Sequence, residues 1–458
     1  MKFAKLLVML VIVALAFAAV SVQAQEESAT TYNRIDEVMD WGAATTMLIV
    51  DLQAEVPQGS VDAESFSVTV TRSDDRLATP LLEEGARTVV EAYISDAEGN
   101  AVDAGAFATL VMEIGPQVSL GAALNYGMDP ATELYFNVWT QNDYVITQEK
   151  AIGDIEGGLV ATEMDQYWRP LLDQFELASG AYEDEEYGTI ELNYAHYAPA
   201  EDGASHPLVV WLHGGGEGGT DATIPLAANK ATAFVAEDVQ AYFGGAYILV
   251  PQAPTRWMDT GLPTDDHIGI ESIFTRALQA LVESYVAENP AIDPNRIYLG
   301  GLSNGGFMTL RLLLDYPDYY AAAIAVAEPF VGESVSDAQL TKIVDLPIWF
   351  VSAATDGVVP ADVYAVNLYN RLLQLGASNA YMSYLPRVLD ESGLYTDEEG
   401  APVEYPGHWS WIYVYNNDLA QVMVGDIVGG QLFGQAAQAA EGDSIMTILE
   451  WLAAQSKS

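Results

Sequence analysis

The first third of the chain contains short runs in which apolar and polar residues alternate. Alternation with a period of two places every second side chain on one face of a β-strand. Turn signals such as Glu98-Gly99-Asn100 separate the runs, and no convincing amphipathic helix interrupts them. We therefore expect a small β-sandwich over residues 30–150. Its strands are expected at residues 47–50, 66–70, 89–94, 110–114, 134–139 and 144–146.

The pattern changes near residue 188, where near-continuous apolar runs begin to alternate with segments of helical periodicity. Apolar runs without alternation are typical of strands buried on both faces. We predict an α/β domain over residues 188–458, with a mostly parallel, doubly wound sheet covered by helices on both faces. Residues 151–187, which include the acidic run 183–186, are predicted to connect the two domains. Strands are expected at 190–194, 208–212, 247–250, 297–299, 323–326, 348–351 and 381–385, and helices at 270–287, 307–314 and around 445–452.

The N-terminus has the three parts of a secretory signal peptide. Lys2 and Lys5 precede an apolar stretch over residues 6–20, and Val22-Gln23-Ala24 offers small residues at the cleavage positions. The apolar stretch is shorter than the roughly 20 residues that a membrane span needs. We therefore expect residues 1–24 to be removed on export, leaving a secreted or cell-envelope protein without a membrane span.

The charge balance is strongly acidic, with 65 Asp and Glu residues against 17 Lys and Arg residues and a formal net charge of −48. Such a surface repels nucleic acids and anionic membranes, which bind basic patches, so we expect neither as a partner. A solvated acidic shell suits high salt or acidic surroundings. The chain has no cysteine, which excludes disulfides and thiolate chemistry. No calcium-binding loop pattern occurs, and no metal or other cofactor is expected.

A candidate nucleophile is Ser303, in Gly301-Leu302-Ser303-Asn304-Gly305. The pentapeptide lies between a predicted strand and a predicted helix, which is the arrangement of a nucleophile elbow. Glycine on both sides allows a sharp turn that lifts the hydroxyl clear of the sheet.

A serine hydroxyl needs a base and an orienting acid, and in doubly wound hydrolases these follow in the order Ser, acid, His. Of the five histidines, His408 alone follows every plausible acid, in the sequence Pro406-Gly407-His408-Trp409. Asp356 comes just after the predicted strand 348–351, where a carboxylate points into the crevice above the sheet. Glu328, after the preceding strand, is the alternative acid.

The oxyanion of a tetrahedral intermediate needs backbone N–H donors. We expect one from Asn304, directly after the nucleophile, and one from Gly215 in the run 213–219, His-Gly-Gly-Gly-Glu-Gly-Gly. The same run fits the Gly-x-Gly-x-x-Gly pattern of dinucleotide-binding proteins. That pattern requires a helix opening at its last glycine, and Pro225 opposes a helix running through this point, so nucleotide binding is disfavoured.

Taken together, these motifs resemble secreted α/β-hydrolase esterases of the type related to polyhydroxybutyrate depolymerases and feruloyl esterases, often described as prolyl-oligopeptidase-like. The resemblance covers residues 185–455. It implies an α/β-hydrolase fold and Ser303, Asp356 and His408 as a catalytic triad. More loosely, the β-rich front resembles the immunoglobulin-like domain attached to some of these esterases. The matching segments are 213–219, Pro251-Gln252-Ala253-Pro254 with Trp257, 293–298, 301–305, Tyr316-Pro317, 356–360 and 407–411.

Three features leave alternatives open. Trp257 is expected either to line the pocket of an acyl or aromatic group or to belong to the core. Asp356 and His408 are 52 residues apart, which is longer than the resemblance leads us to expect, and the acidic segment 390–406 could cover or narrow the site. The segment 416–442, rich in Gly, Ala and Gln, has no assigned role.

The leading interpretation is a secreted serine carboxylic-ester hydrolase that acts on a small or polymeric ester without a cofactor. A serine peptidase of related fold and a non-catalytic surface-binding protein are the alternatives. The front domain, which lacks histidine and a candidate nucleophile, is expected to anchor the protein, shape the rim of the cleft or mediate homo-oligomerisation through its strand edges.

Overall fold

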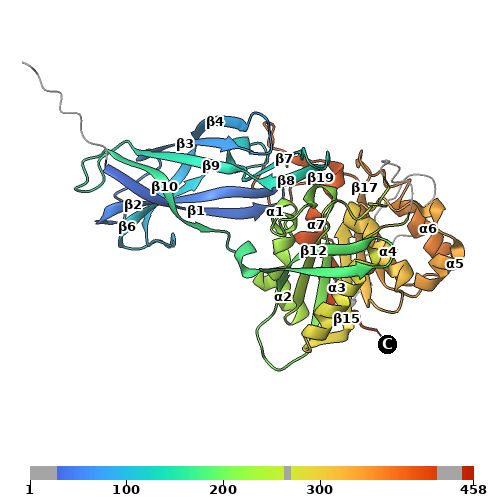
Figure 1. Ribbon diagram of the computed structural model, residues 1–458. Coiled ribbons are helices and arrows are strands. Elements are labelled where there is room, and N and C mark those ends of the chain that lie inside the picture. The colour runs from blue at the N-terminus through green and yellow to red at the C-terminus, as the bar shows by residue number, and fades with distance from the viewer. Residues whose placement is uncertain (1–27, 263–269, 420–445, 458) are drawn as a thin grey trace, which may run out of the picture.

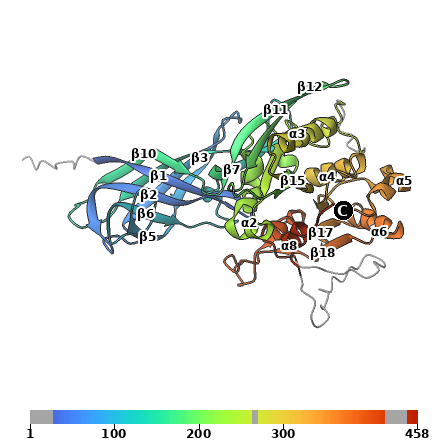
Figure 2. The same ribbon diagram turned by 90° about the horizontal axis from the view of Figure 1, so that it is seen from below.

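The computed structural model describes residues 28–262, 270–419 and 446–457. The expected signal peptide and most of the segment 416–442 lie outside these residues. Two domains stand side by side along the long axis of the molecule (Figure 1). The first is built from strands, and the second is a helix-covered sheet (Figure 2). No helix in the described part of the chain is long and apolar enough to cross a membrane.

The N-terminal domain is all-β and encloses its own apolar core. Strand β3 shows how this core forms, because its buried residues alternate with more exposed ones. Leu48, Val68, Ile94 and Tyr144 meet in that core. The strand order is β4-β3-β9-β10-β1-β2-β6-β5, and neighbours are antiparallel except for the parallel pair β1 and β10. The strands are β1 (Ser28–Met39), β2 (Gly42–Pro57), β3 (Phe66–Ser73), β4 (Leu81–Arg87), β5 (Val89–Ser95), β6 (Ala104–Met112), β9 (Gln141–Gln148) and β10 (Leu159–Trp168).

A separate hairpin of β7 (Leu124–Met128) and β8 (Tyr135–Trp139) extends from this domain toward the second one. Strand β8 packs against the short helix η3 (Gly215–Glu217) and against α1 (Ile224–Ala228). The Trp139 indole N–H donates to Thr223 Oγ1 at 2.8 Å. A second link joins Lys230 Nζ to Asp40 Oδ1 at 2.7 Å. The two domains therefore share specific polar contacts.

The second domain contains an eight-stranded sheet in the order β11-β12-β14-β13-β15-β16-β17-β18. Strands β11, β12 and β14 pair antiparallel, and every other pair in this sheet is parallel. This is the predicted α/β-hydrolase architecture, and each expected strand of the domain is present. The strands are β11 (Glu176–Asp184), β12 (Gly188–Tyr197), β13 (His206–Leu212), β14 (Tyr247–Gln252), β15 (Ile292–Leu302), β16 (Ala322–Val326), β17 (Ile348–Ala353) and β18 (Ala380–Leu385).

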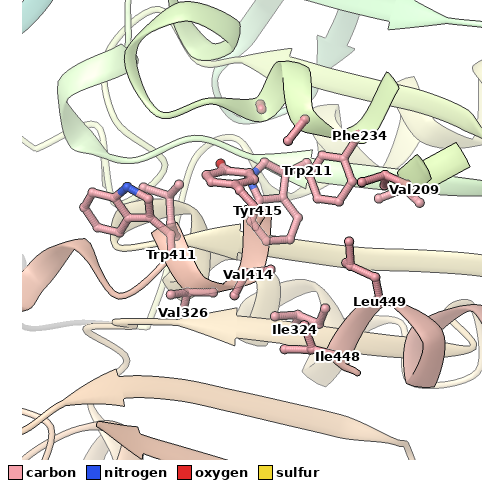
Figure 3. Packing of buried hydrophobic residues seen from close by; sticks show 14 of the residues in the cluster. Val209, Trp211, Phe234, Ile324, Val326, Trp411, Val414, Tyr415, Ile448 and Leu449 are labelled. Carbon is pink, nitrogen blue, oxygen red and sulfur yellow. The ribbon is translucent and has the colours of Figure 1, made fainter. Parts of the chain in front are cut away.

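Helices cover both faces of this sheet because its strands are apolar on both sides. Along β13, Val209 and Trp211 face one apolar cluster, whereas Leu208 and Val210 face the other. The first cluster includes α2 (Glu237–Phe243), α7 (Ile412–Tyr415) and α8 (Ile448–Ala453), as Figure 3 shows for the packing around Trp211. The second includes α3 (Thr275–Glu288), α4 (Asn304–Asp315), α5 (Asp337–Leu340) and α6 (Ala365–Gln374).

The prediction that residues 151–187 form a connecting segment is wrong. Strand β10 completes the N-terminal sheet by pairing with β1, and β11 forms the edge of the second sheet by pairing with β12. The acidic run 183–186 covers the end of β11 and the beginning of the turn to β12, and Asp184 pairs there with Arg276 at 2.7 Å. The connection between the two domains is therefore the short stretch between β10 and β11.

Candidate active site

Ser303 occupies the tight turn between β15 and α4. Its φ of 51° lies in the left-handed region, which is uncommon for a residue other than glycine. Its N–H donates to the Val326 carbonyl at 2.8 Å, so the neighbouring strand β16 holds this conformation. A side chain on Gly305 would begin 2.1 Å from the Leu212 carbonyl oxygen. Glycine is required there because the helix passes directly over β13.

The structure brings Ser303, His408 and Asp356 into one hydrogen-bonded row. His408 Nε2 lies 3.0 Å from Ser303 Oγ, and His408 Nδ1 lies 2.8 Å from Asp356 Oδ2. The Asp356 side chain is fully buried, and its Oδ1 accepts the backbone N–H groups of Val358 and Val359 at 2.9 and 2.8 Å. An acid fixed in this way holds the imidazole with Nδ1 protonated, which leaves Nε2 free to accept a proton from serine.

The alternative acid, Glu328, lies elsewhere. It is completely buried after β16, and its Oε2 accepts the Phe330 N–H at 2.6 Å. Burial raises the pKa of Glu328 well above its ordinary value. It makes no hydrogen bond to His408, so the geometry favours Asp356 as the partner of the imidazole.

The glycine-rich loop 213–219 follows β13 and passes beside the serine. His213 is fully buried, and burial lowers its pKa to about 4, so its imidazole is neutral. Its Nε2 accepts the Ala253 N–H at 3.0 Å, and its Nδ1–H donates to the Gly214 carbonyl at 2.6 Å. The histidine therefore ties the start of the loop to the end of β14.

Both expected oxyanion donors line the cavity that contains Ser303. A Cβ on Gly215 would lie 3.9 Å from the Asn304 Cβ, so the two residues are close neighbours. Neither the Gly215 N–H nor the Asn304 N–H is used in a hydrogen bond within the described residues. Both groups therefore remain available to an oxygen atom placed near Ser303 Oγ.

The expectation that Pro225 keeps helix away from this region needs correction. Helix α1 begins at Ile224 and contains Pro225 in its first turn, where proline removes no intrahelical hydrogen bond. This helix starts five residues after Gly219, so it does not open at the last glycine as a dinucleotide-binding turn requires.

The cavity has a volume of about 690 Å³ and is built by both domains. The catalytic domain contributes Ser303, His408 and two tryptophans, Trp409 and Trp411. The β7–β8 hairpin and the start of β2 supply one wall, which agrees with a rim-shaping role for the front domain. The residues of this wall were not predicted, because no local signal marks residues of one domain as part of the other's cleft. The contributors from the N-terminal domain are Trp41, Gly42, Ala43, Ala122, Leu124, Tyr126 and Asn137.

Trp257 is a core residue and does not line this cavity, which settles the open alternative against a substrate-binding role. Its side chain is fully buried and packs against His213, with ring centroids 5.0 Å apart, and against Phe274 at 6.0 Å. The indole therefore packs against His213, the first residue of the glycine loop.

No residue of the acidic segment 390–406 lines the cavity in the part of the chain that the structure describes, so the segment does not narrow it. It packs beside the N-terminal domain, where Tyr395 contacts Trp41 edge-on at 4.8 Å. No group of three or more His, Cys, Asp or Glu side chains in the described ranges is arranged to hold a metal ion.

Comparison with known proteins gives matches for both domains. Residues 31–161 match a family described as the esterase Ig-like N-terminal domain, and residues 277–349 match the prolyl oligopeptidase family. Poly(3-hydroxyalkanoate) depolymerase C of Paucimonas lemoignei is 32% identical over 139 residues, which are 29% of this chain and 30% of the depolymerase. The match thus spans less than a third of that relative.

A solved structure of a thermostable esterase resembles this chain with a TM-score of 0.69 and 22% sequence identity. The similarity covers 93% of this chain and 99% of that one. At this level of identity the comparison establishes a shared fold, and its coverage extends over both domains.

Proposed function

We propose that this chain, an α/β-hydrolase with an esterase-type immunoglobulin-like N-terminal domain, hydrolyses carboxylic esters through an acyl-enzyme on Ser303. The observation that supports this most directly is the row of hydrogen bonds from Asp356 through His408 to Ser303. A partly exposed hydroxyl that is hydrogen-bonded to an imidazole, at the wall of a cavity, is the arrangement that nucleophilic catalysis needs.

In the proposed mechanism, Ser303 Oγ attacks the ester carbonyl carbon while His408 Nε2 takes the hydroxyl proton. Asp356 stabilises the resulting imidazolium through Nδ1–H. The carbonyl oxygen becomes an oxyanion that accepts the N–H groups of Gly215 and Asn304. Collapse breaks the bond to the alcohol oxygen, which receives the proton from Nε2. Water then attacks the acyl-serine by the same route and releases the acid.

The proposal is tested with Ser303→Ala, because alanine removes the attacking oxygen without adding volume. The variant should lose turnover of p-nitrophenyl acetate and labelling by a fluorophosphonate, with an unchanged circular dichroism spectrum. Ser284→Ala, on the exposed side of α3, is the matched control. Activity of Ser303→Ala close to that of the parent protein would show that another nucleophile acts.

A peptidase activity is the second candidate, because residues 277–349 match the prolyl oligopeptidase family. The arrangement of the triad and of the oxyanion donors suits the hydrolysis of an ester as well as that of a peptide. Turnover of short p-nitrophenyl esters and of blocked peptides, measured side by side, distinguishes the two. We expect the ester to be preferred by orders of magnitude. The similarity to a polyester depolymerase makes an insoluble polyester a third substrate to include.

We also propose that the protein is exported and that the N-terminal domain mediates self-association. Export rests on the signal-like residues 1–24, and mass spectrometry of the secreted protein should find the mature N-terminus near Gln25. Strands β4 and β5 end the N-terminal sheet and pair with no further strand among the described residues. Light scattering that gives a monomer mass would remove the association proposal.

A further inference from the structure

Arg256 lies in the wall of the active-site cavity and has no partner among the residues that the structure describes. It follows β14 in the segment 254–258, and the cavity wall includes Arg256 together with Ser303, Gly215 and Tyr126. Its Nε is buried without a hydrogen bond, and it lies 3.7 Å from where a Cβ on Gly215 would stand. A buried donor without an acceptor is costly, so its presence needs an explanation.

The lack of a partner is unusual in this chain. Every other arginine in the described ranges donates to a carboxylate, a carbonyl or a hydroxyl, and Arg256 makes no hydrogen bond or ion pair to any described residue. Asp259, three residues away, is engaged with the Thr255 hydroxyl at 2.6 Å and the Gly261 N–H at 2.8 Å. Carboxylates greatly outnumber cations in the chain, so a shortage of acids does not explain why this guanidinium has no partner within the described ranges.

The local structure holds Arg256 in place. The next residue, Trp257, is fully buried, and the Met258 N–H donates to Asn304 Oδ1 at 3.3 Å. The Asp259 N–H closes a turn onto the Arg256 carbonyl at 3.0 Å. The backbone on the C-terminal side of Arg256 is therefore tied to the nucleophile elbow, which fixes the origin of the side chain relative to Ser303.

Glu217 is the carboxyl group that could compete for Arg256, since both line the cavity. No ion pair joins them, and Asn137 Nδ2 donates to Glu217 Oε1 at 3.1 Å. Burial raises the pKa of Glu217 to about 7, so this carboxyl is largely neutral below that pH. Under those conditions the guanidinium charge in the cavity is not cancelled by its neighbour.

We propose that Arg256 binds a carboxylate carried by the substrate, so that the enzyme prefers esters with an acidic group close to the scissile carbonyl. A guanidinium forms paired, charge-assisted hydrogen bonds with a carboxylate and suits this role better than an ammonium group. The inference rests on the proposed ester hydrolysis and adds the class of substrate: half-esters of dicarboxylic acids, or esters whose alcohol part ends in a carboxylate.

The test compares anionic esters with neutral esters of similar shape at pH 6.5. One pair is 4-acetoxybenzoate with 4-acetoxybenzamide, and the other is the p-nitrophenyl half-ester of adipic acid with p-nitrophenyl hexanoate. The measured quantity is the ratio of kcat/KM for the anionic ester to kcat/KM for the neutral ester. In Arg256→Gln this ratio should fall at least about tenfold for one of the pairs, as expected for loss of a hydrogen bond to a charged group. The ratio for Arg256→Lys should lie between those of the parent protein and Arg256→Gln, because lysine keeps the charge and loses the paired hydrogen bonds.

Arg387→Gln is the matched control. It removes the same charge from an exposed arginine that pairs with Glu404 and does not line the cavity. The proposal is overturned if Arg256→Gln leaves both ratios unchanged. It is also overturned if Arg387→Gln lowers the ratios equally, because the preference for anionic esters would then come from the electrostatic field of the whole protein. Failure of ester hydrolysis itself would be seen separately, as absence of turnover of the neutral esters by the parent protein.

Discussion

Asn137 on strand β8 of the N-terminal domain donates from Nδ2 to the Gly216 carbonyl and to Glu217 Oε1, at 3.2 and 3.1 Å. Both acceptors belong to the glycine loop of the catalytic domain. The same loop is tied to its own domain through Gln252 Nε2, which donates to the Glu217 carbonyl at 2.9 Å. The loop that presents the Gly215 N–H is therefore held between the two domains.

Asn137→Ala should lower kcat on p-nitrophenyl acetate by about tenfold with little change in KM. The reason is that a loosened loop presents its N–H groups less well to the oxyanion, and removal of one such donor can cost 10²–10³ in kcat. The affinity of a boronic acid inhibitor, whose adduct resembles the tetrahedral intermediate, should fall in parallel.

Trp139→Phe is the control for Asn137→Ala, since it removes another hydrogen bond between the domains, to Thr223, without touching the glycine loop. It should leave kcat and boronic acid affinity nearly unchanged. Equal losses in both variants would mean that general domain adhesion, and not loop position, matters for activity.

Asp356→Asn should reduce kcat by orders of magnitude, whereas Glu328→Gln should reduce it little. An amide at position 356 no longer holds His408 with Nδ1 protonated. Glu328 makes no contact with the imidazole, and burial already favours its neutral form, which glutamine resembles. Steady-state kinetics of the two variants decide between the candidate acids, and a larger loss in Glu328→Gln would reverse the assignment.

The arrangement of Ser303, Asp356 and His408 could be predicted because it depends on chain order in a known type of sheet. Ser303 and Asp356 follow parallel strands, whose carboxyl ends meet at one edge of the sheet, and His408 is the one histidine that follows every plausible acid in the chain. The other strands of the α/β sheet were predictable because continuous apolar runs of this length favour buried strands, whereas β11, which is mostly exposed, was not predicted. The glycines around Ser303 carried the remaining information, because only they permit the close approach of α4 to β13.

Other features depend on contacts between distant parts of the chain. The N-terminal wall of the cavity, with Trp41, Tyr126 and Asn137, follows from how two domains dock, and neither domain's strand pattern encodes it. Trp257 was ambiguous because sequence position does not tell which way an indole points. Residues 151–187 were wrongly predicted to be a connecting segment because β10 and β11 are largely exposed and lack a continuous apolar run.

Screening by salt should raise the melting temperature of the protein. With a formal net charge of −48, mutual repulsion opposes the compact state. Counterions shorten the range of that repulsion to about 10 Å at 0.1 M salt. The melting temperature should rise steeply between low salt and a few tenths molar NaCl and more slowly toward molar concentrations. A melting temperature that stays constant or falls would contradict this account.

Glu217 should make stability depend on pH in a predictable direction. Burial raises its pKa from 4.5 to about 7. Below pH 4.5 the carboxyl is protonated in the folded and the unfolded chain, so it contributes nothing. Between pH 4.5 and 7 the unfolded chain releases the proton and the folded chain keeps it, so stability falls as pH rises. A shift of this size corresponds to roughly 3 kcal/mol, lost in full above pH 7.

Glu217→Gln removes this titration while keeping an oxygen that accepts from Asn137. The melting temperature of the variant relative to the parent protein should therefore increase by several degrees from pH 5 to pH 7.5 and then stay level. Using the difference between two proteins cancels the contributions of Glu328 and of the acidic surface. Glu185→Gln, at an exposed position, removes the same charge and should give a difference that changes far less over this range. If the difference for Glu217→Gln is flat with pH, or shrinks as pH rises, the buried carboxyl is not the protonated group described here.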